Sequence, residues 1–225
     1  MIEYLVALDI EAFKILNGAF NPFLDHFMWL VSGKFAWILM CIALLYVVFR
    51  NNWKNGVVSL LFIALTITLC DQISSTFIKH TVERLRPTHT EALMPLVHTV
   101  NGYVGGLYGF VSSHAANSFG VAMFLALMFK QRLFSLLIFL WAVILSYSRI
   151  YLGVHFPGDI LGGAIVGLLV GYLVYFIYIK LRATKYGIYV NIDKPTELQL
   201  KIINISICMN MCILLLVSAV MYFMG

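Results

Sequence analysis

The chain has 225 residues, of which 62% are hydrophobic and 11% are charged, and its formal net charge is +5 at pH 7. Its mean hydropathy of +0.93 lies far outside the range of soluble domains, so the composition excludes an ordinary soluble protein and indicates an integral membrane protein. Because no Ser/Gly-rich linker or internal repeat divides the sequence, we predict one all-α membrane domain over residues 1–225.

The first stretch, MIEYLVALDIEAFKILNG, predicts an amphipathic helix that lies in the membrane interface, within an interfacial segment at 1–32. Its apolar residues recur at approximately helical spacing and so form one face. Glu3, Asp9 and Glu11 interrupt the stretch and no basic region precedes it, which is not typical of a cleavable signal sequence. A seventh, shallow membrane span is the alternative interpretation.

Six apolar runs predict membrane-spanning helices, because such a helix needs ~20 mostly apolar residues. The third and fourth runs are separated only by KQR and predict an antiparallel hairpin, while the sixth is an additional helix beyond a catalytic core at 33–180. The predicted spans are 33–50, 56–78, 114–130, 133–149, 160–180 and 202–224.

Basic residues gather in the breaks on one side of this six-span bundle. Since cytoplasmic loops are enriched in Lys and Arg, we predict that this side is cytoplasmic and that the 79–113 loop and the 150–159 turn face the periplasm across a bacterial inner membrane. The loop cations account for most of the net charge, so we expect no nucleic-acid partner. They are Arg50, Lys54, Lys130, Arg132, Lys180, Arg182, Lys185, Lys194 and Lys201.

Three polar clusters lie at helix ends on the predicted outer side: KHTVERLRP at 79–87, FVSSHAANS at 110–118 and SRIYLGVHFPGD at 148–159. Phosphoryl transfer spreads negative charge over several oxygens, and fixed cations stabilise that charge. Amides at the start of the 114–130 helix would add to such a site. The clusters therefore predict phosphate binding by Lys79, Arg86, Arg149, Ser112 and Ser113.

The same clusters supply candidates for the chemical steps. His155 is the predicted nucleophile, and Asp159, four residues later, would accept its second N–H and hold the required tautomer. His114 would protonate the leaving oxygen and then activate the water that hydrolyses a phosphohistidine. Because side chains supply the positive charge, we expect no metal ion and no cofactor.

These motifs resemble those of the type 2 phosphatidic acid phosphatase superfamily, which read K-x6-RP, PSGH and SR-x5-H-x3-D. The first and third are complete here, whereas Val111 and Ser113 stand where the family usually has proline and glycine. Vanadium-dependent haloperoxidases share the motifs and hold vanadate instead of phosphate. The known haloperoxidases are soluble, so the membrane spans favour a lipid phosphatase acting on a lipid phosphate in the bilayer.

The sequence is most similar to compact bacterial lipid A 4′-phosphatases. It resembles them in chain length, in the SSH variant of the second motif and in the overall arrangement of the loops. Undecaprenyl pyrophosphate and phosphatidylglycerol phosphate phosphatases remain alternative interpretations. A non-enzymatic transporter, in which intramembrane charges mark an ion path, is an alternative of another class. It would require polar residues on both sides, whereas the ionisable cluster here lies on one side.

Other polar residues receive structural interpretations. Arg84 matches no motif position, so we assign it to the membrane boundary, where long basic side chains reach toward water. Asp71, Ser75 and Lys79 repeat every fourth residue and so share one helix face, and we expect a structural role for Asp71. No role is assigned to His26, His80, His89 and His98, and a packing role is expected for Cys41, Cys70, Cys208 and Cys212.

Overall fold

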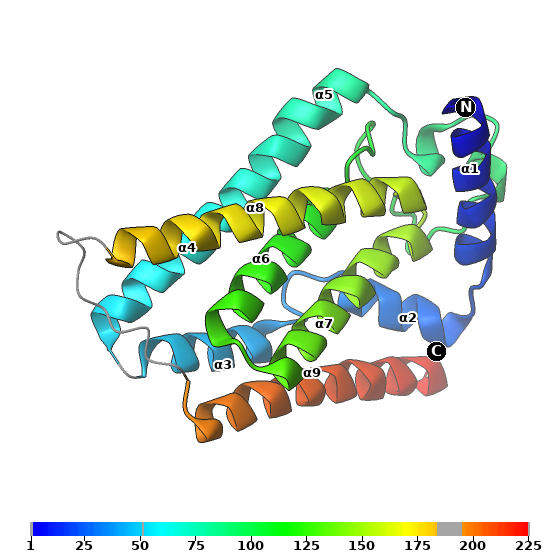
Figure 1. Ribbon diagram of the computed structural model, residues 1–225. Helices are drawn as coiled ribbons and strands as arrows, with labels where there is room; N and C mark the ends of the chain where they lie inside the picture. The colour runs from blue at the N-terminus through cyan, green and yellow to red at the C-terminus, as the bar shows by residue number, and fades with distance from the viewer. Residues whose placement is uncertain (1, 51, 184–194, 225) are drawn as a thin grey trace.

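The computed structural model describes residues 2–50, 52–183 and 195–224, and the regular structure in these ranges is helical apart from one isolated bridge between Leu85 and Tyr108 (Figure 1). The α-helices are α1 (Ile2–Gly18), α2 (Pro22–Val31), α3 (Ile38–Phe49), α4 (Trp53–Asp71), α5 (Lys79–Val82), α6 (Ser113–Phe129), α7 (Arg132–Tyr151), α8 (Pro157–Ala183) and α9 (Glu197–Met224). A π-helix, Gln72–Ile78, joins α4 to α5, and Pro87–His89 and Met94–Leu96 form 3-10 turns.

Within the described residues, four helical stretches are long and apolar enough to cross a membrane: Trp53–Val82, Arg132–Tyr151, Pro157–Leu181 and Glu197–Met224. Two shorter apolar helices are Ile38–Phe49 and Ser113–Phe129. The predicted all-α bundle with six apolar segments is confirmed, although the boundaries differ. The cations predicted at Lys185 and Lys194 lie outside the described residues.

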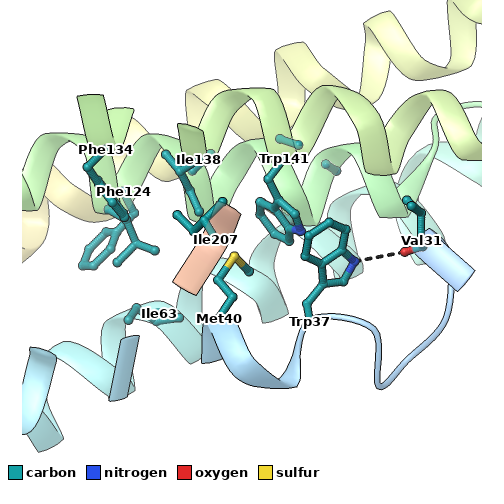
Figure 2. Packing of buried hydrophobic residues seen from close by; sticks show 14 of the residues in the cluster. Val31, Trp37, Met40, Ile63, Phe124, Phe134, Ile138, Trp141 and Ile207 are labelled. Carbon is teal, nitrogen blue, oxygen red and sulfur yellow. Dashed lines mark hydrogen bonds between the residues drawn. The ribbon is translucent and has the colours of Figure 1, made fainter. Parts of the chain in front are cut away.

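The start of the first predicted span, at 33, is wrong because a turn separates α2 from α3. The side chain of Asn210, from α9, accepts from the Met40 amide at 3.3 Å and donates to the Ala36 carbonyl at 2.5 Å. Trp37 Nε1 also donates to the Val31 carbonyl at 3.0 Å (Figure 2). Non-helical backbone at membrane depth needs such partners inside the protein. These contacts therefore fix the turn that carries Ser32.

Glycines bring the backbones of α6 and α8 into contact. A Cβ at Gly167 would lie 2.3 Å from the Ala116 carbonyl oxygen, and a Cβ at Gly171 would lie 2.4 Å from the Gly120 carbonyl oxygen. Small residues spaced by four favour such close helix packing in membranes. This contact sets the helix that begins with Ser113 and His114 against the helix that carries Asp159.

The main apolar core lies between α2, α3, α4, α6, α7, α8 and α9. Figure 2 shows its packing, with Phe124 and Phe134 at one end and Trp37 against Trp141 at the other. Ile207 brings α9 into the same cluster. The additional C-terminal helix therefore packs against α2, α3 and α7, of which α7 carries Arg149.

The two N-terminal helices, which lie in the predicted interfacial segment at 1–32, differ from one another in burial. Helix α1 crosses the end of the bundle at which α8 begins and α9 ends (Figure 1). It packs Phe13 against Phe156 and leaves Tyr4 and Ile15 exposed, as expected for an interfacial helix. Helix α2 instead buries Phe27, Met28 and Val31 in the main core, and the interfacial position of residues 1–32 stays a prediction.

Candidate active site

The turn between α7 and α8 presents the predicted nucleophile. Gly153 has φ +76°, a conformation that glycine adopts readily, and its amide donates to the Ile150 carbonyl at 2.9 Å. The next amide, of Val154, donates to the Arg149 carbonyl at 3.1 Å. This reversal places His155 between the end of α7 and the start of α8, with only 1% of the residue exposed.

Two neighbours determine the tautomer of His155. Its Nδ1 lies 3.3 Å from Asp159 Oδ2, and its Nε2 lies 2.9 Å from Arg86 Nη1. A guanidinium group can only donate, so Nε2 must accept and the ring proton must be on Nδ1. Nε2 therefore carries the lone pair that nucleophilic attack requires.

Burial also keeps His155 uncharged. Desolvation lowers the pKa of His155 well below its ordinary value of 6.5, and the positive charges of Arg86, Arg149 and Lys79 lower it further. A neutral imidazole is the nucleophilic form. The surroundings of His155 thus favour the protonation state that the sequence-based mechanism requires.

The carboxylate of Asp159 is fully buried at the start of α8 and has partners on both oxygens. Oδ2 accepts from the Phe156 amide at 3.0 Å as well as facing His155, while Oδ1 lies 3.0 Å from Arg84 Nη1. A buried carboxylate is stabilised by such pairing. Asp159 is therefore held by Arg84 while it orients His155.

The assignment of Arg84 to the membrane boundary is wrong. Its Nη2 lies 2.7 Å from Asp9 Oδ2 on α1, and its guanidinium lies 4.2 Å from the centre of the Phe156 ring. Asp9 Oδ1 in turn accepts from the Gly158 amide at 2.7 Å. Arg84 thus links α1 to the candidate catalytic residues. Its position two residues before the motif residue Arg86 was the sequence signal that placed it near the site.

Arg86 is 8% exposed and is fixed by backbone carbonyls. Its Nε donates to the Tyr108 carbonyl at 3.1 Å, and Nη1 donates to the Val154 carbonyl at 2.9 Å. Desolvation lowers the pKa of Arg86, and the nearby charge of Arg149 lowers it further. Two buried guanidinium groups that repel one another are the arrangement expected where an anion binds between them.

Arg149, near the end of α7, is held by two side-chain hydroxyl groups. Its Nη1 donates to the Ser32 hydroxyl, and its Nη2 donates to the Tyr103 hydroxyl at 2.9 Å. Arg149 Nε is buried without a hydrogen-bond partner in the described part of the chain. This donor fits the predicted role of Arg149 in phosphate binding, because phosphate oxygens accept from guanidinium groups.

Lys79 ends a chain of hydrogen bonds that joins the Asp71–Lys79 helix face to α6. Its Nζ donates to Ser113 Oγ at 3.1 Å, and Ser113 Oγ lies 2.8 Å from Ser75 Oγ. Ser75 Oγ donates to Asp71 Oδ1 at 3.1 Å, in agreement with the structural role expected for Asp71. The Ser113 side chain, at the position of the usual family glycine, therefore positions Lys79.

The start of α6 carries two further residues of the predicted phosphate-binding site, Ser112 and Ser113. Ser112 is the N-cap residue: its hydroxyl accepts from the Ala115 amide at 3.4 Å, and its own amide donates to the Asp159 carbonyl at 3.0 Å. A phosphate contact by the Ser112 hydroxyl stays a prediction. The amides of Ser113 and His114, in the first turn, have no intrahelical partner and lie at the positive end of the helix dipole.

His114 lies on the open side of the site. It is exposed, unlike His155, and lines a cavity of about 400 Å³ together with Arg149. The structure thus places the two predicted catalytic histidines in different surroundings, one buried beside Arg86 and one facing a cavity. In the described ranges, no group of three or more His, Cys, Asp or Glu side chains is arranged to hold a metal ion.

His98, to which no role was assigned, anchors the loop after Arg86. Its Nε2 lies 2.8 Å from Asp25 Oδ1, and its ring stacks on Phe20 at 3.9 Å. Asn17 holds the same segment, because its side chain bonds to the His98 amide and carbonyl. The N-terminal helices therefore hold the loop that contains Tyr103.

Comparison with known proteins identifies the family. The PAP2 superfamily, that of the type 2 phosphatidic acid phosphatases, matches residues 56–183. The chain is 46% identical over 185 residues to a lipid A 4′-phosphatase of Bacteroides thetaiotaomicron, covering 81% of this chain and 82% of the relative. It is 39% identical over 187 residues to a lipid A 4′-phosphatase of Porphyromonas gingivalis, covering 83% and 79%.

A solved structure has the same arrangement of helices. It is the crystal structure of a transmembrane PAP2 type phosphatidylglycerolphosphate phosphatase from Bacillus subtilis, with a TM-score of 0.57 and 25% identity, covering 81% of this chain and 89% of that one. The matched family region includes all three motifs, from Lys79 to Asp159. The chain belongs to the PAP2 superfamily.

Proposed function

We propose that the protein is a membrane lipid phosphatase that removes the 4′-phosphate of lipid A through a phosphohistidine intermediate. The arrangement of Arg86, His155 and Asp159 carries this proposal, because it holds a buried neutral imidazole with its lone pair directed at a cation. The two lipid A 4′-phosphatases that resemble the chain over about four fifths of its length support the choice of lipid.

Substrate binding prepares the nucleophile. A phosphate oxygen replaces His155 Nε2 as the acceptor of the Arg86 N–H, so that the lone pair becomes available for attack on phosphorus. Arg149, Lys79 and the first amides of α6 bind the remaining oxygens. These donors are already oriented by their protein partners, and preorganised donors stabilise the charge of the transition state.

Two displacements at phosphorus follow. His155 Nε2 forms the P–N bond as the bond to the sugar oxygen breaks, and His114 gives that oxygen a proton. Asp159 stabilises the positive imidazole ring that results. His114 then takes a proton from water, which attacks phosphorus, breaks the P–N bond and releases inorganic phosphate.

We place this site at the periplasmic face of a bacterial inner membrane. The connections between α3 and α4 and between α6 and α7 lie at the end of the bundle away from α1 (Figure 1). Arg50, Lys54 and Lys130 belong to or border these connections, and Lys and Arg are enriched on the cytoplasmic side. The acyl chains of the lipid would lie in the bilayer while the phosphorylated head group enters from the outer leaflet.

Phosphate release in detergent micelles tests the proposed function. Lipid A, undecaprenyl diphosphate and phosphatidylglycerophosphate are compared side by side, with His155→Ala as the inactive control. The proposal predicts the highest kcat/KM for lipid A. A higher kcat/KM for either other lipid would assign the enzyme to that substrate class instead.

A further inference from the structure

The cavity beside His114 has a lining that phosphate binding does not require. Its volume of about 400 Å³ falls in the range of small-molecule sites. His114 and Arg149 belong to both the cavity and the phosphate site, so the two are continuous. The other lining residues come from the end of α2, the turn before α3, the 97–112 loop and the end of α7: Trp29, Ser32, Gly33, Lys34, Tyr103 and Leu152.

The cavity lies on the leaving-group side of phosphorus. The attacking and leaving atoms are roughly in line in phosphoryl transfer, so the leaving group is opposite His155. His155 does not line the cavity, whereas His114, the residue that would protonate the leaving oxygen, does. The part of the substrate that enters this cavity is therefore the group that carries the leaving oxygen.

Aromatic and hydroxyl groups determine what this cavity can hold. The rings of Trp29 and Tyr103 lie edge to face, with centroids 6.0 Å apart. The hydroxyls of Ser32 and Tyr103 each accept from Arg149 and donate to no other group in the described part of the chain. Each can therefore donate its own hydrogen to a ligand. Lys34, which is exposed, adds an ammonium group at the edge.

We infer that this cavity is a sugar subsite, in which the pyranose ring that bears the phosphate packs its C–H face on Trp29 while its polar substituents bond to Tyr103, Ser32 and Lys34. This inference rests on the proposed function and specifies how the head group is recognised. Glycerol has no ring face to pack on Trp29. A prenyl diphosphate would place its second phosphate in the cavity and likewise has no sugar ring to pack on Trp29.

The test compares Trp29→Leu with Trp29→Phe, which keeps an aromatic face. Each is assayed on lipid A and on phosphatidylglycerophosphate in the same micelles. Loss of one apolar contact with a substrate typically changes kcat/KM by roughly 10–200-fold, so Trp29→Leu should lose at least about ten-fold on lipid A and a much smaller factor on the glycerol lipid. Trp29→Phe should keep most of the activity on both.

Lys34→Gln should raise KM for lipid A more than it lowers kcat.

Controls separate a subsite from a folding defect. Trp53→Leu removes an exposed tryptophan at the start of α4, and it should affect both lipids equally or not at all. The inhibition constant for inorganic phosphate should be the same in Trp29→Leu and wild type, since phosphate occupies only the neighbouring site. Equal losses by Trp29→Leu on the two lipids would overturn the sugar subsite and leave the proposed function intact. Wild-type enzyme that hydrolyses only the glycerol lipid would overturn both.

Discussion

Arg86 Nη1 lies 2.9 Å from His155 Nε2, so a predicted phosphate-binding group donates to the nitrogen that would attack phosphorus. The contact holds the ring in one tautomer until an oxygen of the substrate takes the same donor. The guanidinium also bonds to the carbonyls of Tyr108 and Val154, which fix its plane. In the proposed mechanism, Arg86 therefore orients the nucleophile as well as binding the substrate.

Replacing Arg86 with lysine tests this double role. Arg86→Lys keeps the positive charge but cannot reach both carbonyls and His155 at once. Loss of one preorganised donor typically costs roughly 10²–10³ in kcat, and we expect a loss of this size in the first-turnover rate. Arg50→Lys, at the other end of the bundle, is the matched control. A defect confined to KM would show that Arg86 only binds phosphate.

Arg84 provides the second prediction, because it is the charged partner of the buried Asp159. Arg84→Gln leaves that carboxylate without its ion-pair partner, so both kcat and the melting temperature should fall. We expect kcat to fall about ten-fold or more, by weaker orientation of His155. Arg84→Lys should recover part of both. Lys14→Gln, which breaks only the exposed Lys14–Glu11 pair, should leave stability within about 0.5 kcal/mol of wild type.

The pKa of His155 makes stability depend on pH. The native ring stays neutral below pH 6.5, where the unfolded chain binds a proton at this residue, so acid favours unfolding. One such proton lowers the free energy of unfolding by about 1.4 kcal/mol per pH unit below 6.5, until the lowered native pKa is reached. The melting temperature should therefore fall by less between pH 7.5 and pH 5.5 in His155→Gln than in wild type. Equal slopes would contradict a buried neutral histidine.

Membrane orientation can be tested by labelling. In a chain whose four native cysteines are replaced by alanine, Glu91→Cys in the loop after Arg86 should react with an impermeant thiol reagent in intact spheroplasts. Lys130→Cys, in the α6–α7 turn, should react only after the membrane is disrupted. Both positions are exposed, so burial does not explain a difference. The reverse pattern would place the site in the cytoplasm.

Much of the fold could be predicted because the length of an apolar run can be determined from contiguous residues in the sequence. The runs that became α7, α8 and α9 are long and uninterrupted, and their positions were predicted within a few residues at most ends. The turn between α2 and α3 could not be predicted in this way. Its backbone is stabilised by Asn210, about 170 residues away, and no local pattern indicates that contact.

The site residues also divide into those that a local sequence pattern predicts and those that depend on contacts between distant elements. Lys79, Arg86, Arg149, His114, His155 and Asp159 carry motifs with fixed spacing, and the structure brings them to one end of the bundle. Arg84 and Tyr103 belong to no motif. Arg84 acts through Asp9 on α1, and Tyr103 contacts Arg149 from a loop. Such contacts depend on how distant elements pack, so only the structure reveals them.

The most direct test of the mechanism is rapid-quench measurement of the first turnover with lipid A labelled in its 4′-phosphate. Wild type should form an acid-labile, base-stable phosphoenzyme, and His155→Ala should form none. His114→Ala should form it more slowly, by about 10²–10⁴-fold on lipid A and much less on an aryl phosphate, because a phenol leaves without needing a proton. A phosphoenzyme that still forms in His155→Ala, or equal defects of His114→Ala on the two esters, would contradict the assigned roles.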